Sequence, residues 1–145
     1  MKGISCYTHF VTDIGFENQD FQIEFEVDVP NSEYLYLGLI NNLYSVSKDC
    51  CCTNPSNAFY YRNYGAIIIN RFVYKPDKII ELKNKKILGM KVYLNKYPKQ
   101  VGFYFPEMYA DLGYYDIKGD SFRVFFASCM SSKGTVKILN CISLN

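Results

Sequence analysis

The stretch that decides the fold is Lys86–Phe105, with the sequence KILGMKVYLNKYPKQVGFYF. Within Lys86–Leu94 every second residue is apolar, and the same alternation returns in Val101–Phe105. The apolar positions are Leu88, Met90, Val92, Leu94, Val101, Phe103 and Phe105. A period of two residues is typical of a β-strand with one face against a core and the other toward water. The stretch therefore predicts two adjacent strands joined by the short turn Asn95–Pro98.

The same pattern recurs along most of the chain. In Gln22–Val29, QIEFEVDV, apolar residues at 23, 25, 27 and 29 alternate with polar ones. Further strands are predicted at Tyr34–Ile40, Phe59–Tyr61, Ala66–Asn70, Arg71–Tyr74, Lys78–Leu82, Ser121–Cys129 and Thr135–Leu144. Because a link of hairpin length joins Gln22–Val29 to Tyr34–Ile40, we expect these two strands to be antiparallel neighbours.

About ten short strands without a long helix favour an all-β fold. Two packed antiparallel sheets, a β-sandwich, are the economical arrangement, and a barrel is the alternative. Two segments interrupt the alternation, Asn41–Asn57 and Pro106–Lys118. Long irregular segments inside a compact domain are usually functional. Pro106–Ala110 is expected to hold a single helical turn.

Composition limits the class of protein. A chain of 145 residues with 49% apolar residues fits one domain spanning residues 1–145. The net charge of +2 and the scattered lysines argue against a nucleic-acid binder. No signal peptide or membrane-spanning run is apparent, so we expect no membrane association. With six cysteines and no secretory signal, the expected setting is the cytoplasm, with reduced thiols.

The order of segments resembles the SPRY/B30.2 domain, a bent, jelly-roll-related β-sandwich. The similar stretches are FEVDVPNSEYLYLGLINN, AFYYRNYGAIIIN, KKILGMKVYLNKYPKQVGFYF and FRVFFASCMSSKGTVKIL, which together cover most of the chain. The resemblance implies a protein-interaction module without enzymatic activity. It further implies a peptide or an exposed loop of a partner protein as the ligand, held by loops at one end of the sandwich.

The residue types and their spacing give little support for a catalytic site or a metal site. Three consecutive cysteines, Cys50–Cys52, cannot easily converge on one zinc ion. Cys129 and Cys141 fall in apolar strands, where a free cysteine is usually a small core residue. His9 is the only histidine, and nothing places it beside a cysteine as a catalytic base. We therefore expect neither a metal nor another cofactor, and no enzymatic activity.

The candidate binding residues are aromatic side chains in and beside the irregular segments. They are Tyr60, Tyr61, Arg62, Tyr64, Tyr109, Tyr114 and Tyr115, and they are expected to line one exposed groove. The alternative for each tyrosine is that it only covers the edge of the core. Arg62 either pairs with an acidic partner or merely solvates a turn. Two other functions stay open, a carbohydrate-binding sandwich and a structural subunit of a larger assembly.

Overall fold

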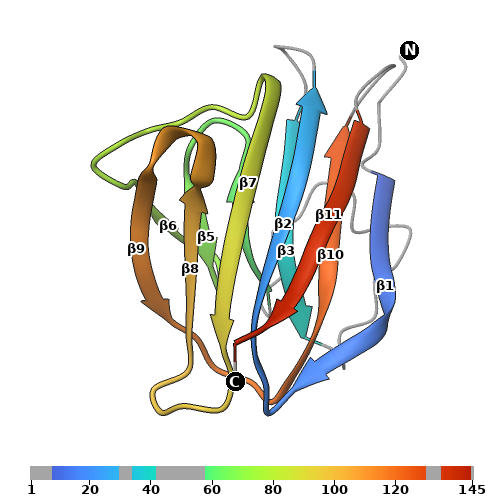
Figure 1. The fold of residues 1–145 in the computed structure, drawn as a ribbon, viewed down its shortest axis with the longest axis vertical. Coiled ribbons are helices and arrows are strands. Elements are labelled where there is room, and N and C mark those ends of the chain that lie inside the picture. Colours follow the sequence, from blue (N-terminus) through green and yellow to red (C-terminus); the bar gives the residue numbers. More distant parts are fainter. Residues whose placement is uncertain (1–7, 30–33, 42–57, 130–134, 145) are drawn as a thin grey trace.

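The computed structural model describes residues 8–29, 34–41, 58–129 and 135–144, which form eleven strands and one short 3₁₀ helix (Figure 1). The strands are β1 (Thr8–Glu17), β2 (Asp20–Val29), β3 (Tyr34–Asn41), β4 (Ala58–Arg62), β5 (Ile67–Ile69), β6 (Phe72–Tyr74), β7 (Asn84–Tyr93), β8 (Gln100–Phe105), β9 (Ala110–Asp116), β10 (Ser121–Cys129) and β11 (Thr135–Ser143). The helix, η1, spans Pro106–Met108, within the segment expected to hold a helical turn.

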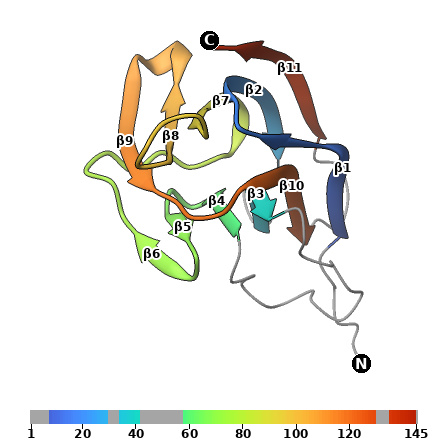
Figure 2. The ribbon, with the colours of Figure 1, turned by 90° about the horizontal axis from the view of Figure 1, so that it is seen from below.

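The strands form two antiparallel sheets that pack face to face (Figures 1 and 2). We call the six-stranded sheet, with the order β1-β10-β3-β4-β5-β6, sheet A. The five-stranded sheet, with the order β11-β2-β7-β8-β9, is sheet B. The predicted all-β sandwich is therefore confirmed.

The stretch Lys86–Phe105 forms the two strands that its alternation predicts. β7 and β8 are antiparallel neighbours, with Met90 opposite Phe103 and Val92 opposite Val101. The predicted core positions of both strands are all buried, at 0–2% exposure: Leu88, Met90, Val92, Leu94, Val101, Phe103 and Phe105. The inner faces of β2, β3, β4, β5 and β10 supply most of the remaining core.

The expected hairpin between Gln22–Val29 and Tyr34–Ile40 is wrong. β2 pairs with β11 and β7 in sheet B, whereas β3 pairs with β10 and β4 in sheet A. Both strands nevertheless direct their apolar side chains into the same core, from opposite sides. Alternation fixes which face of a strand is buried, but a short link can either turn within one sheet or cross to the other.

Two further expectations need correction, and one strand was not expected. Thr8–Glu17 forms an edge strand that the alternation did not indicate, and most of the segment predicted as irregular after Pro106 is strand β9. Conversely, Lys78–Leu82 joins no sheet. It is an extended connection whose Ile80 and Leu82 enter the core. Hydrogen bonds from the Leu82 amide to the Asn63 carbonyl and from the Tyr61 hydroxyl to the Ile80 carbonyl hold it there.

The central strands of sheet A, β3 and β4, are buried on both faces. The outer face of sheet A holds a second apolar cluster, made of Tyr36, Ile40, Ala58, Tyr60, Ile68 and Phe125. The rings of Tyr36 and Tyr60 stack there with 4.9 Å between their centroids. The side chains of β3 and β4 that alternate with the central-core residues are therefore buried as well, and this face of the two strands is not solvated.

Burial raises the pKa of the Tyr60 and Tyr61 phenols well above the ordinary value near 10. In the unfolded chain both groups ionise near pH 10, so the free energy of unfolding is expected to fall as pH rises above that value. A pH titration followed by tyrosinate absorbance and circular dichroism checks this. The two phenols should ionise together with loss of structure, and ionisation of every tyrosine in the folded protein near pH 10 would contradict it.

Candidate functional site

Strand β6 forms one edge of sheet A. It pairs with β5 alone among the described strands, and Asn70 and Arg71, both with positive φ, make the two-residue turn between them. All three of its residues are exposed, Phe72 at 69%, Val73 at 52% and Tyr74 at 43%. Three exposed apolar residues on a strand edge are a template for pairing with another chain.

A groove of about 620 Å³ opens beside this edge, at one end of the sandwich. We call it the edge groove. Its lining comes from the β5–β6 hairpin, the β7–β8 turn and the β9–β10 link, which Figure 2 views from that end. The apolar part of the lining consists of Ile69, Phe72, Tyr74, Tyr97, Pro98 and Ile117. Of these, Ile69 and Ile117 are buried, whereas Tyr97 is 95% exposed.

Polar groups in the groove are held in fixed positions. The Lys99 ammonium donates to the Gly119 carbonyl at 2.8 Å and to the Asp120 carboxylate at 3.0 Å, and its side chain is only 15% exposed. The Asp116 carboxylate accepts a hydrogen bond from the Gln100 amide at 2.9 Å. Lys99 thus connects the β7–β8 turn to the β9–β10 link.

Tyr115 is the predicted site residue that lies next to the edge groove. Its ring packs against the groove residue Tyr74 with a centroid distance of 5.1 Å, so β9 of sheet B meets β6 of sheet A there. Burial, then the charges of Asp77 and Tyr74, raise the pKa of the Tyr115 phenol. The Tyr115 hydroxyl can donate a hydrogen bond.

The expectation that Tyr60 and Tyr61 line an exposed groove is wrong, since both are 0% exposed. Tyr61 points into the central core, where its ring lies 5.7 Å from Phe103, and Tyr60 belongs to the outer cluster of sheet A. Both side chains of this dipeptide are buried because β4 lies between two apolar layers.

The other predicted residues do not gather in one place. Arg62 is placed over the Tyr36 ring at 5.5 Å, and Tyr64 follows it in the β4–β5 turn. Tyr109, 97% exposed, forms the corner between η1 and β9, at the end of the sandwich opposite the edge groove (Figure 1). Tyr114 lies on the outer face of sheet B, against Tyr93. The structure does not bring these residues together with Tyr115.

Sequence reasoning missed the aromatic residues of the edge groove, Phe72, Tyr74 and Tyr97. A signal was present in Arg71–Tyr74. Three consecutive apolar residues in a short strand, next to a two-residue turn, show no alternation. A strand without a polar phase is buried on both faces or presents apolar side chains at an edge.

The predicted irregular segment Asn41–Asn57, which includes Cys50–Cys52, lies outside the described residues except for Asn41. At its borders, Asn41 and Ala58 lie at the end of the sandwich where the edge groove opens. Cys141 is exposed, so its expected place in the core is wrong. Among the described residues no group of three or more His, Cys, Asp or Glu side chains could hold a metal ion, and no helix could cross a membrane.

Comparison with known proteins supports the fold. No protein-family model and no curated protein matches the chain. The crystal structure of the SPRY domain of human HERC1 is similar, with a TM-score of 0.69 over 94% of this chain and 84% of that chain. The two sequences are 14% identical. At this identity the similarity shows a shared fold, and it confirms the SPRY-like sandwich expected from the sequence.

Proposed function

We propose that this chain is a non-enzymatic protein-interaction module that binds an extended peptide segment of a partner protein in the edge groove. The observation that carries the proposal is the exposed, apolar edge of β6 beside the groove. An added strand would find backbone donors and acceptors along β6. The groove volume of about 620 Å³ lies within the usual range for binding pockets.

The residues also support a division of roles within the groove. Phe72, Tyr74 and Tyr97 are aromatic side chains of the kind that anchors a partner. Lys99 and Asp120 form an ion pair at the polar rim of the groove. Lys118 and Asp116 add one charge of each sign, which favours a peptide with both apolar and polar side chains over a nucleic acid. Tyr115 supports Tyr74 from the opposite sheet.

Replacing Phe72 with alanine is expected to weaken peptide binding by more than about 1 kcal/mol, roughly fivefold. Peptides selected by display on the native protein provide the ligand, and calorimetric titration gives the dissociation constant. The melting temperature should hardly change, since Phe72 is 69% exposed.

Tyr109→Ala is the matched control. It removes a 97% exposed aromatic side chain at the other end of the sandwich and should leave the affinity unchanged. The proposal fails if Tyr109→Ala weakens binding while Phe72→Ala does not. It also fails if a glycan array yields specific ligands and peptide display yields none.

A further inference from the structure

Strand β11 forms one edge of sheet B, on the side of the sandwich away from β6 (Figure 2). Among the described strands it pairs with β2 alone, over nine residues. Large apolar side chains are exposed along this edge: Ile138 at 52%, Leu139 at 45%, Ile142 at 49% and Leu144, directly after the strand, at 37%. An edge strand with several exposed apolar side chains is a site for pairing with another chain.

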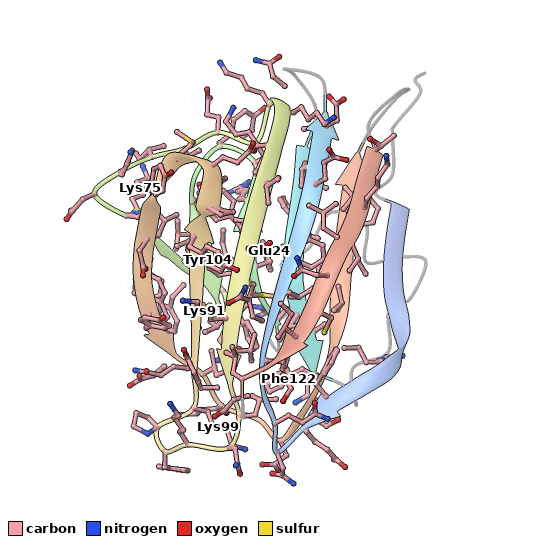
Figure 3. All side chains as sticks on the ribbon, viewed as in Figure 1. Glu24, Lys75, Lys91, Lys99, Tyr104 and Phe122 are labelled. Carbon is pink, nitrogen blue, oxygen red and sulfur yellow. The ribbon has the colours of Figure 1, made fainter. Side chains whose placement is uncertain are left out.

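Hydrogen bonds hold β11 in the sheet as an ordered strand. The Glu24 carboxylate of β2 accepts hydrogen bonds from the Asn140 amide of β11 at 3.1 Å and from the Tyr104 hydroxyl of β8 at 2.8 Å (Figure 3). Beyond the strand, the Leu144 amide donates to the Asp20 carbonyl at 2.9 Å. An added strand would therefore meet an extended backbone that is already in place.

The two edges of sheet B differ in charge. The opposite edge strand, β9, carries two exposed carboxylates, Asp111 and Asp116. In β11 the single charged side chain is Lys137, and its ammonium lies 3.7 Å from the Glu26 carboxylate. Charged side chains on an edge strand oppose pairing with another chain. β11 is thus the less protected of the two edges.

A β-bulge in the middle of β11 determines which kind of strand fits against it. The register with β2 shifts between Ile138 and Asn140. Before the bulge, Ile138 lies opposite the core residue Phe25, and after it Cys141 lies opposite the core residue Ile23. Successive positions on the inner face are therefore three residues apart at the bulge, not two. A strand with regular alternation can match the two faces of β11 on one side of the bulge only.

A second copy of β11 carries the same bulge and can match the strand on both sides of it. If a two-fold axis passes through the bulge, Ile138 lies opposite Cys141 of the second copy, both on the inner face. Lys137 then lies opposite Ile142 of the second copy, both on the outer face. The two Lys137 residues are about 17 Å apart along the strands, so their repulsion is largely screened.

We propose that the chain forms a symmetric homodimer in which β11 pairs antiparallel with β11 of a second copy. The same patch then serves both copies, as a two-fold interface requires. The pairing joins the two five-stranded B sheets into one continuous sheet. Because one strand from each copy makes the contact, the interface is small and the dimer should dissociate on dilution. The edge groove at β6 belongs to the other sheet and stays accessible.

Sedimentation velocity at concentrations from about 1 to about 100 µM tests the proposal, and dimer should replace monomer over this range. Ile142→Lys places a second ammonium opposite Lys137 of the other copy and is expected to weaken dimerisation about tenfold. Ile79→Lys is the matched control, since it makes the same change at an isoleucine that is 57% exposed on the β6–β7 link. It should weaken dimerisation less than about twofold.

A thermal melt of each variant shows that it remains folded. A protein that stays monomeric at about 100 µM would overturn the proposal. Equal dissociation constants for Ile142→Lys and Ile79→Lys would also overturn it, because a surface other than β11 would then form the dimer.

The variant Ile138→Cys tests the register without adding charge. Residues directly opposite each other in an antiparallel pair are close enough for a disulfide. Mild oxidation with diamide should therefore give a covalent dimer in which position 138 is joined to Cys141 of the second copy, as identified by peptide mapping. Ile79→Cys, oxidised in the same way, should give no such dimer. Absence of the link between positions 138 and 141 in Ile138→Cys would contradict the proposed pairing.

Discussion

Replacing Phe103 with alanine is expected to lower the free energy of unfolding by about 3–5 kcal/mol. Phe103 is 1% exposed and lies at the centre of the core, where its ring packs against Tyr61. The truncation removes a fully buried ring and leaves a cavity between the sheets. Chemical denaturation followed by circular dichroism measures the loss.

Phe72→Ala is the control for this prediction. It removes the same side chain from an exposed edge and should change stability by less than about 0.5 kcal/mol. An unchanged stability of Phe103→Ala would mean that the strand is displaced by one residue and that its two faces are exchanged.

The second large effect is expected at Gly38, in the middle of β3. A Cβ at this position would stand 2.1 Å from the Phe59 carbonyl oxygen and 2.5 Å from the Tyr60 Cα. Both atoms belong to the backbone of β4, so no side-chain rotation relieves the clash. Gly38→Ala should therefore separate β3 from β4 and cost about 3 kcal/mol of stability, measured by the same denaturation experiment.

Gly113→Ala provides the comparison. There an added Cβ meets nothing within 4 Å, but φ is 90°, so only backbone strain of about 1 kcal/mol is expected. Equal losses at Gly38 and Gly113 would show that close packing of β3 on β4 is not what requires glycine at position 38.

Strands in which apolar and polar residues alternate could be predicted from the sequence, because the alternation shows which side chains are buried. In β2, Ile23, Phe25 and Val27 are buried and the intervening Glu24 and Glu26 lie on the outer face, as the sequence indicates. The assignment of strands to sheets was not predictable in this way. β2 and β3 show equivalent patterns, and the same short link serves a hairpin or a crossing between sheets.

The prediction that Tyr60 and Tyr61 are exposed is wrong because β4 has no exposed face. The sequence indicates a recognition surface at Tyr60 and Tyr61 because aromatic residues cluster beside a turn. The outer face of sheet A, however, carries its own apolar cluster, so the clustering reflected burial on both sides. The groove residues Phe72 and Tyr97 come from a short hairpin and a turn that the fold brings together, and no spacing in the sequence indicates that proximity.

The most direct test of the account is amide hydrogen exchange of the protein with and without a display-selected peptide. If the partner segment adds to β6 and fills the edge groove, protection should appear in residues 69–74 and 116–120. Protection confined to residues 62–66 and 106–109, at the opposite end of the sandwich, would contradict the proposed binding site.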